Sequence, residues 1–433
     1  MPPDPVVHIA GLHGDGSLAF ISRGSLWLLD TSTYSVHELV PAKDHPDAPQ
    51  FSADGKWLAF LAHRRVGGTW ICLVRSDGGG MHRLHRRDIA FDGWAPRGHR
   101  LAIDFVSRRG AVPVRDTSVV ATWRPGTEPR AVARVGGLTG VVWSPDGREL
   151  GIATADWDRR GSVPGTTSIA TYPIAGGRPT IWFSRLGQHG RLEGEDELYL
   201  RLAGWWQGQG IGFWLFGNGE VLSPDQAPLE LLVAPRSQPR RLGQTLPGGG
   251  ALAGGRGEAE ERTVDASRLG YLADVDQIGR DGFGRQIWFR KRLTVCAPAA
   301  TCRRVPAPPR TVTLDPAWSP DGKTLAYVIA PSRASVGFPQ RIVRRWYAAH
   351  RLALYRPSTG RVRYIHGTAG ASAPMWSRDG KDLIYAARDG IWLLRVGAAR
   401  ATRVATPLFA PGDLPAYYGQ VDWVGQFAWS AGG

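Results

Sequence analysis

A short hairpin motif recurs along this chain and constrains its fold more than any other feature. Its best copy spans Pro316–Tyr327 and reads PAWSPDGKTLAY, a strand followed by a tight turn and a second strand. In the turn, Pro fixes φ, Asp bonds its own backbone and Gly tolerates a positive φ. After the turn, Leu325, Tyr327 and Ile329 alternate as one face of a strand. One such hairpin means little, but its repetition dictates an architecture.

Further copies of the hairpin bring the total to eight. Close copies occupy Phe51–Phe60, Trp143–Ile152 and Trp376–Tyr385, and weaker or degenerate ones occupy His13–Phe20, Trp94–Ile103, Trp205–Phe213 and Asp265–Tyr271. Their spacing of roughly 40 to 60 residues is typical of propeller blades with loops of variable length. A third strand follows each hairpin, as in Leu352–Tyr355, and then a Gly-containing turn and a short fourth strand. Four antiparallel strands repeated around an axis form a β-propeller.

We therefore predict an all-β fold, a single β-propeller of four-stranded antiparallel blades that uses residues 1–433 as one domain. Eight blades are expected, or seven if a degenerate unit does not form. The N-terminal unit lacks a first strand, whereas Val424–Gly433 resembles a first strand whose remainder is missing. Phe427–Ser430 is thus predicted to pair with Ser17–Ser22 and close the ring, because closure removes exposed sheet edges. Tryptophans at the shared hairpin position should pack between blades.

Three segments interrupt the repeat. They lie near residues 185–200, 242–262 and 330–350, and they are predicted to be flexible insertions because the first is charged and the second is rich in Gly and Glu. The third is long, and a helical turn is expected over Ile342–Ala349. A degenerate blade follows the second insertion, which favours one domain over two.

The hairpin consensus resembles the TolB-like, WD-repeat-like propeller family, whose signature is P-x-W-S-P-D-G-x-x-L-A-F/Y. The resemblance covers nearly the whole chain and implies the propeller fold. It says little about function, because this scaffold hosts many activities. TolB itself is similar only over its propeller, because its N-terminal α/β domain has no counterpart ahead of the first repeat.

Charge and cysteines bear on partners and compartment. The formal net charge is +15, and Arg supplies nearly all of the 53 basic residues. This bias suits an anionic partner, and it arises equally well from a GC-rich genome. Cys296 and Cys302 fall on facing strands of one hairpin, where they either form a disulfide or remain two thiols, while Cys72 is expected to be a buried thiol. A disulfide and the family resemblance favour a periplasmic or other extracytoplasmic location, although the sequence as given begins with no signal peptide.

Arginines gather in the predicted loops between second and third strands, which converge on one face of a closed ring. Because Arg forks bind carboxylates and phosphates, this face is the predicted binding site for a protein or an anionic glycan or peptide. The alternative is that these are ordinary solvated loop residues. The site comprises Arg64, Arg65, Arg108, Arg109, Trp157, Arg159, Arg160, Arg344 and Arg345. Trp205 and Trp206 either line the channel, where they could stack on a sugar or peptide, or pack between blades.

Catalytic and metal motifs are not found in the sequence. The nearest string to a G-x-S-x-G nucleophile elbow is Gly370–Pro374, which lacks the last Gly. His82, His85 and His99 are close in sequence but straddle a blade boundary, so no metal or cofactor is assigned. We predict a non-catalytic binding or scaffold propeller, monomeric, without a membrane span or nucleic-acid partner. The alternatives are a channel-site enzyme acting on acidic carbohydrate and an accessory propeller for peptide processing.

Overall fold

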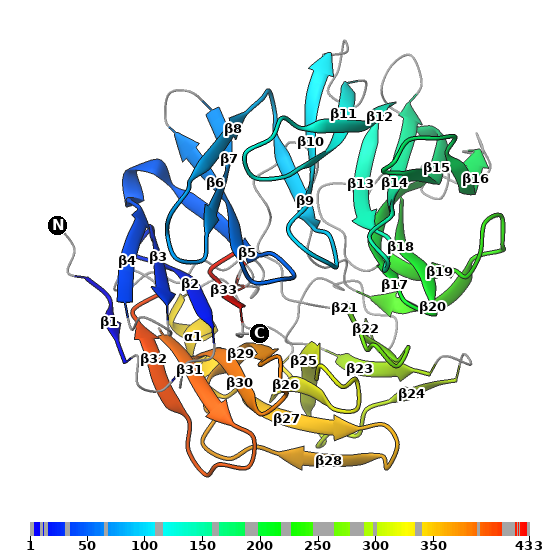
Figure 1. Ribbon diagram of the computed structural model, residues 1–433. Coiled ribbons are helices and arrows are strands. Elements are labelled where there is room, and N and C mark those ends of the chain that lie inside the picture. Colours follow the sequence, from blue (N-terminus) through cyan, green and yellow to red (C-terminus); the bar gives the residue numbers. More distant parts are fainter. Residues whose placement is uncertain are drawn as a thin grey trace.

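The computed structural model is an eight-bladed β-propeller, as the repeat predicts (Figure 1). The structure describes residues 4–8, 12, 16–30, 35–64, 68–108, 116–157, 164–186, 198–217, 227–245, 264–277, 290–297, 301–333, 340–387, 390–408, 421, 423 and 425–430. Each blade is an antiparallel sheet whose strands follow one another in chain order, except in the blade that contains both ends of the ring.

The first four blades occupy the N-terminal half of the chain. Blade 1 holds β33 (Phe427–Ser430), β2 (Ser17–Ser22), β3 (Ser25–Asp30) and β4 (Ser35–Val40), followed by the 3-10 turn η2 (Ala42–Asp44). Blade 2 holds β5 (Pro46–Phe51), β6 (Trp57–Arg64), β7 (Gly68–Arg75) and β8 (His82–His85). Blade 3 holds β9 (Ala90–Trp94), β10 (Leu101–Arg108), β11 (Thr117–Trp123) and β12 (Arg130–Gly136). Blade 4 holds β13 (Leu138–Trp143), β14 (Glu149–Trp157), β15 (Pro164–Pro173) and β16 (Thr180–Leu186).

The last four blades complete the ring. Blade 5 holds β17 (Leu198–Trp206), β18 (Gly210–Gly217), β19 (Ala227–Leu232) and β20 (Arg240–Thr245). Blade 6 holds β21 (Val264–Ala266), β22 (Leu272–Gln277), β23 (Lys291–Cys296) and β24 (Cys302–Arg304). Blade 7 holds β25 (Thr311–Trp318), β26 (Leu325–Pro331), helix α1 (Gln340–Ala348), β27 (Arg351–Arg356) and β28 (Arg361–Tyr364). Blade 8 holds β29 (Ala371–Trp376), β30 (Asp382–Ala387), β31 (Gly390–Arg395) and β32 (Thr402–Thr406), with β1 (Val6–Val7) added at its edge.

The hairpin turns repeat one hydrogen-bond pattern, which explains why the motif is visible in sequence. In blade 7 the Ser319 hydroxyl donates to Asp321 Oδ1 (2.6 Å) and accepts from the Thr324 amide (3.0 Å). The Gly322 amide donates to the Ser319 carbonyl at 2.8 Å, with φ of 71–72° at the Gly of this turn and of the corresponding turns in blades 4 and 8. The same contacts recur in blades 2, 4 and 8. Ser, Asp and Gly therefore act together in each turn.

Tryptophans at the end of the first strand join neighbouring blades, as predicted. The indole N–H of each donates to a carbonyl oxygen in the innermost strand of the preceding blade. These pairs are Trp94 with Gln50 (2.9 Å), Trp143 with Gly93 (2.9 Å), Trp318 with Asp265 (3.1 Å) and Trp376 with Ala317 (2.9 Å). We call these contacts the indole bridges. Each bridge fixes the position of one blade against the next.

The ring closes as the sequence predicts, and a second contact supports the closure. β33 pairs antiparallel with β2, with Phe427 opposite Phe20 and Ser430 opposite Ser17. In addition, β1 pairs with β32, so the N-terminal side of the chain joins the last blade. Strand β1 (Val6–Val7) was not predicted from the sequence. Two terminal strands thus hold blades 1 and 8 together.

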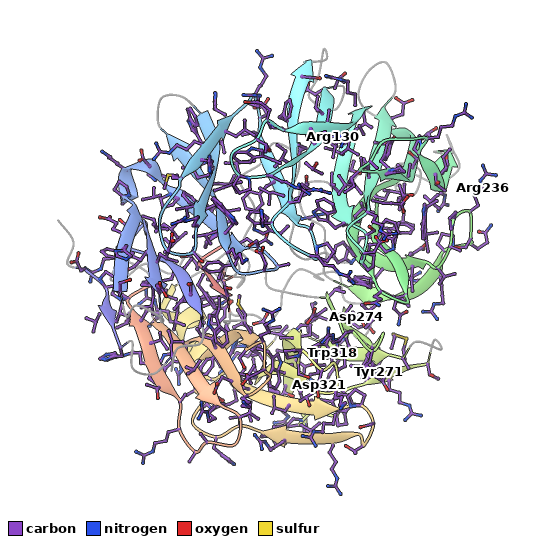
Figure 2. All side chains as sticks on the ribbon, in the orientation of Figure 1. Arg130, Arg236, Tyr271, Asp274, Trp318 and Asp321 are labelled. Carbon is purple, nitrogen blue, oxygen red and sulfur yellow. A yellow bond between two sulfur atoms is a disulfide. The ribbon has the colours of Figure 1, made fainter. Side chains whose placement is uncertain are left out.

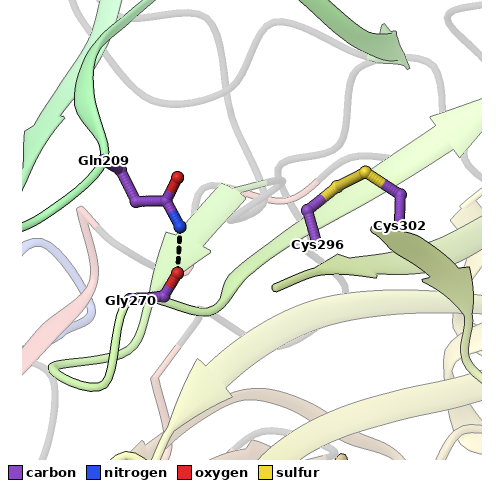
Figure 3. The surroundings of a disulfide bond; sticks show 4 residues. All are labelled: Gln209, Gly270, Cys296 and Cys302. Carbon is purple, nitrogen blue, oxygen red and sulfur yellow. Dashed lines mark hydrogen bonds between the residues drawn. A yellow bond between two sulfur atoms is a disulfide. The ribbon is translucent and has the colours of Figure 1, made fainter. Parts of the chain in front are cut away.

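Blades 5 and 6 depart from the regular pattern. Their strands form one continuous sheet, joined where Thr245 of β20 pairs with Asp276 of β22. The Gln209 side-chain amide donates to the Gly270 carbonyl across the two blades (Figure 3). Cys296 and Cys302 form a disulfide between β23 and β24, where they are direct register partners, and Cys72 is buried in blade 2. Of the two alternatives for Cys296 and Cys302, the structure shows the disulfide, and the expected burial of Cys72 is confirmed.

The predicted insertions are only partly described. Residues 187–197, 246–263 and 334–339 lie outside the described residues, so the expected flexibility of these segments stays a prediction. The helical turn expected near residue 342 is α1, which begins two residues earlier than predicted. Among the described residues, no helix has the length and apolar character to span a membrane.

Candidate functional site

Helix α1 departs from the repeat on the face where second strands end. It stands between β26 and β27, and its Val343, Trp346 and Tyr347 are buried because their spacing places them on one face. The Trp346 indole N–H donates to the Pro331 carbonyl (2.8 Å), which ties the helix to the end of β26. Tyr347 also packs edge-on against Trp423 at 6.0 Å, just ahead of the closing strand. The helix is therefore held in one orientation.

The opposite face of α1 is basic and exposed. Arg341, Arg344 and Arg345 are all exposed, and Ile342 between them is 38% exposed. The helix carries no acidic residue that could neutralise these charges. We call this surface the α1 arginine face. It contains Arg344 and Arg345 of the predicted site, together with Arg341, which the sequence analysis did not include.

The other predicted arginines lie at the ends of second strands. Arg64, Arg108 and Trp157 are the last residues of β6, β10 and β14, and only their backbone is described. Second strands of a propeller all end on the same face, so these positions share the face that carries α1. Arg65, Arg109, Arg159 and Arg160 lie outside the described residues. The wider Arg-rich site therefore stays a prediction.

Trp205 and Trp206 end β17 and are half-buried between blades. Trp205 packs edge-on against Trp182 of blade 4, with ring centroids 5.3 Å apart. The Trp206 ring covers Gly204 and Gly212, where a Cβ would collide with it. These contacts fit the packing alternative. The proposed stacking on a sugar or peptide has no support in them and stays a prediction.

A pair of carboxyl groups in blade 3 was not anticipated. Asp92 falls at a bulge in the innermost strand β9, and Asp104 lies on the neighbouring strand β10. Asp92 Oδ2 is buried and has no hydrogen-bond partner within the part of the chain that the structure describes. Burial raises the pKa of Asp104 to about 7, and burial together with the Asp104 charge raises the pKa of Asp92 well above its usual range. The pair can hold a proton near neutral pH.

Ser372, in the string that approaches a nucleophile elbow, lies beside a histidine but does not form an accessible catalytic group. Its hydroxyl is 3.3 Å from His350 Nδ1, and both residues are almost completely buried. Burial lowers the pKa of His350 to about 3, so the imidazole is neutral at physiological pH. Ser372 belongs to β29 and is 0% exposed. A substrate cannot reach this hydroxyl, which supports a packing role.

The histidines considered for a metal do not converge. His82 and His99 pack on Trp57, with ring centroids 5.7 and 6.3 Å away, whereas His85 stacks on Trp70 at 4.8 Å. His99 Nδ1 also lies 3.0 Å from Asp54 Oδ2. Within the described ranges, no three His, Cys, Asp or Glu side chains are grouped so that they could hold a metal ion.

Matches of this chain to known proteins are found among solved structures. No protein-family model and no curated protein sequence matches this chain. Similar solved structures include a prolyl endopeptidase (12% identity, TM-score 0.48, covering 89% of this chain), an oligogalacturonate lyase in complex with manganese (13%, 0.45, 98%) and TolB from Acinetobacter baumannii (12%, 0.36, 83%).

These matches differ in how much of the other protein they cover. The chain corresponds to 55% of the prolyl endopeptidase, 89% of the lyase and 66% of TolB. TolB, whose family the repeat resembles, is one of these matched structures. At this level of identity, the matches do not assign an activity to the chain.

Proposed function

We propose that this protein is a non-catalytic binding propeller that holds an acidic polypeptide on the α1 arginine face. The observation that carries the proposal is the combination of Arg341, Arg344 and Arg345 on a helix whose other face is anchored. A helix held by Trp346 and Tyr347 loses little conformational freedom when a partner binds, which favours affinity. The exposed Ile342 side chain supplies apolar contact beside the charges.

Charge complementarity supports an acidic partner. The chain carries a formal net charge of +15, and most of its basic residues are Arg, which bind carboxylates in a bidentate manner. We further propose an extracytoplasmic location, because the Cys296–Cys302 disulfide is typical of proteins in oxidising compartments.

The test is titration of a fluorescently labelled ten-residue poly-glutamate peptide at about 150 mM salt, which screens long-range attraction. Substitution of Arg341, Arg344 and Arg345 by Ala should raise the Kd about tenfold, because each exposed charge pair contributes up to about 1 kcal/mol. The control carries Ala at Arg361, Arg363 and Arg403, which are exposed on outer strands of blades 7 and 8. Equal weakening in both variants would attribute binding to net charge and contradict the proposal.

A second candidate function is acid–base chemistry at the Asp92–Asp104 pair, and only the raised pKa values of this pair favour it. A carboxyl group that titrates near pH 7 can donate or accept a proton in catalysis. Acidic oligosaccharides are the substrate class to screen, since the basic chain attracts them. Cleavage that is lost in Asp104→Asn would support this candidate. Screening without any cleavage would leave the binding function as the better account.

A further inference from the structure

Blade 6 buries a carboxylate where the other seven blades bury a large apolar side chain. The position is the second residue after the first buried Leu or Ile of the second strand. It holds Phe20, Phe60, Ile103, Ile152, Phe213, Tyr327 and Tyr385 in the other blades, each at most 1% exposed. In blade 6 it holds Asp274, which is also 1% exposed (Figure 2). A carboxylate costs far more free energy to bury than these side chains do.

The oxygens around this position lack partners. Asp274 Oδ1 and Oδ2 form no hydrogen bond within the part of the chain that the structure describes. The same holds for Oγ1 of Thr294, which is the direct register partner of Asp274 on β23 and is 8% exposed. Buried polar atoms normally have a partner in the protein or in ordered solvent. Three unpartnered oxygens on directly opposed residues therefore indicate a ligand.

A second carboxylate reaches the same place. A Cβ on Gly243 of β20 would lie 3.1 Å from Asp274 Oδ2 and 3.3 Å from Asp276 Oδ1, so both groups approach this glycine. The buried carboxylate of Asp274 requires a counter-charge or a proton.

We propose that Asp274, Asp276 and Thr294 form a binding site for a hard divalent cation of the Ca²⁺ or Mg²⁺ type. All candidate ligands are oxygens, which these ions prefer, and Mg²⁺ in particular is bound through one or two carboxylates with several waters retained. The cation neutralises the buried carboxylate of Asp274, and Asp276 supplies a second carboxylate beside it. The cation also joins β22 and β23 at the junction with blade 5.

The surrounding covalent structure favours a formed site. Thr294 is two residues before Cys296 on β23, and the disulfide ties that strand to β24 (Figure 3). On the other side, β20 is linked to β22 through the Thr245–Asp276 pair. The ligands therefore lie on strands whose relative positions are fixed, which reduces the cost of binding.

The test is calorimetric titration of the full-length, chelator-treated protein with CaCl₂ and MgCl₂ at pH 7.5. We expect one binding event for the wild type and a Tm increase of about 3 °C when the cation is present at 100 times its Kd. Asp274→Asn should abolish binding, and Thr294→Val should weaken it about tenfold. The matched control is Asp104→Asn, at a carboxylate with a raised pKa, which should bind as the wild type does.

Each outcome decides the proposal. Asp274→Asn is isosteric and removes a buried charge, so it should remain folded, which near-ultraviolet circular dichroism would verify. An absence of heat and of Tm change in the wild type with both cations would overturn the proposal and assign Asp274 a proton. Binding that survives in Asp274→Asn but is lost in Asp104→Asn would place the cation in blade 3 instead. This result would likewise overturn it.

Discussion

Blades 7 and 8 and blades 5 and 6 achieve the same four-stranded geometry by different means. In blades 7 and 8, the Ser-x-Asp-Gly turn and an indole bridge recur with little change. Blades 5 and 6 instead share one sheet, and a disulfide and the Gln209–Gly270 contact provide the links. They also bury Arg201, Asp274 and Lys291, which are rare choices for an interior.

The difference teaches that a repeat can lose its signature where other links replace it. The regular blades are stabilised by local turns and apolar burial, so their sequences converge. The irregular blades are stabilised by cross-links between strands, and their buried charged residues include the basic residues Arg201 and Lys291, whereas blades 7 and 8 bury Asp315 and Asp382. The cation site proposed for blade 6 lies where the stabilising pattern has been given up, whereas the proposed binding helix α1 is an insertion in a regular blade.

The largest effect is expected at ring closure, in the regular part of the molecule. Deletion of residues 425–433 removes β33 and should lower the free energy of unfolding by more than about 5 kcal/mol, beyond the range of most single substitutions. Denaturant unfolding followed by tryptophan fluorescence measures this loss. Removal of residues 1–8 is the control, because it breaks only the short β1–β32 pair and should cost about 1 kcal/mol. Unchanged stability without β33 would refute closure.

A tryptophan that forms an indole bridge should contribute more to the free energy of unfolding than a tryptophan of the irregular blades 5 and 6. Trp318→Ala removes an 8% exposed ring and should lower the free energy of unfolding by about 4 kcal/mol. Trp206→Ala removes a half-buried ring and should lower it by about half as much. Trp318→Phe keeps most of the ring and should lose about 1 kcal/mol, for the hydrogen bond to Asp265. Chemical denaturation compares the three variants. A larger loss of stability for Trp206→Ala than for Trp318→Ala would contradict the expected difference between regular blade 7 and irregular blade 5.

Turn carboxylates and buried carboxylates should respond to pH in opposite directions. Hydrogen bonds to the Lys381 amide and the Ser377 hydroxyl lower the pKa of Asp379 to about 2, so its stabilising effect is lost as the pH falls from about 4 to 2. Burial raises the pKa of Asp104 to about 7, so the folded state binds more protons and stability falls as the pH rises from about 4 to 7.

Asp104→Asn should therefore reduce the fall in the free energy of unfolding between about pH 4 and pH 7. The expected change is on the order of 3 kcal/mol between pH 4 and pH 7, measured from urea unfolding at several pH values. Asp146→Asn, at an exposed turn position, serves as the control and should leave the slope between pH 5 and pH 7 as it is in the wild type. A slope unaffected by Asp104→Asn would show that this group does not titrate there.

The smallest of these effects is expected from the disulfide. Replacement of Cys296 and Cys302 by Ser opens a loop with a sequence separation of only six residues, so the loss should be about 2 kcal/mol. Thermal unfolding of the double variant, beside wild type treated with a reductant, measures it. If the loss of stability exceeded that of Trp318→Ala, the disulfide would be the main cross-link of blades 5 and 6.

The fold was predictable because its local signals and its global arrangement agree. The Ser-Pro-Asp-Gly turn announces each regular hairpin, and Phe427–Ser430 repeats a first-strand pattern that only the N-terminal blade could complete. β1 escaped prediction because Val6 and Val7 are too short a segment to carry a pattern. The shared sheet of blades 5 and 6 depends on a single tertiary pair, which no periodicity reveals.

The site residues were harder to predict because they depend on register. Asp92 and Asp104 become neighbours through a bulge in β9, which the spacing of the two residues does not encode. The unusual position of Asp274 could have been recognised from the sequence. Leu272-Ala273-Asp274 aligns with Leu325-Ala326-Tyr327 of the best repeat, so Asp stands where the repeat has an aromatic residue. Arg344 and Arg345 of α1 were found from charge alone, while the anchoring of the helix by Trp346 required the structure.

The pairing of β1 with β32 has a mechanical consequence. Ser17 and Ser430 are opposite one another at one end of the β2–β33 ladder, so pulling these two ends apart would open the ladder one bond at a time. A load applied ahead of residue 6 meets the β1–β32 contact first, where His8 also donates its amide to the Val404 carbonyl. The β1–β32 pair of blade 8 thus carries such a load before the β2–β33 ladder does. β1 therefore protects the closure of the ring from a force applied at the N-terminal side.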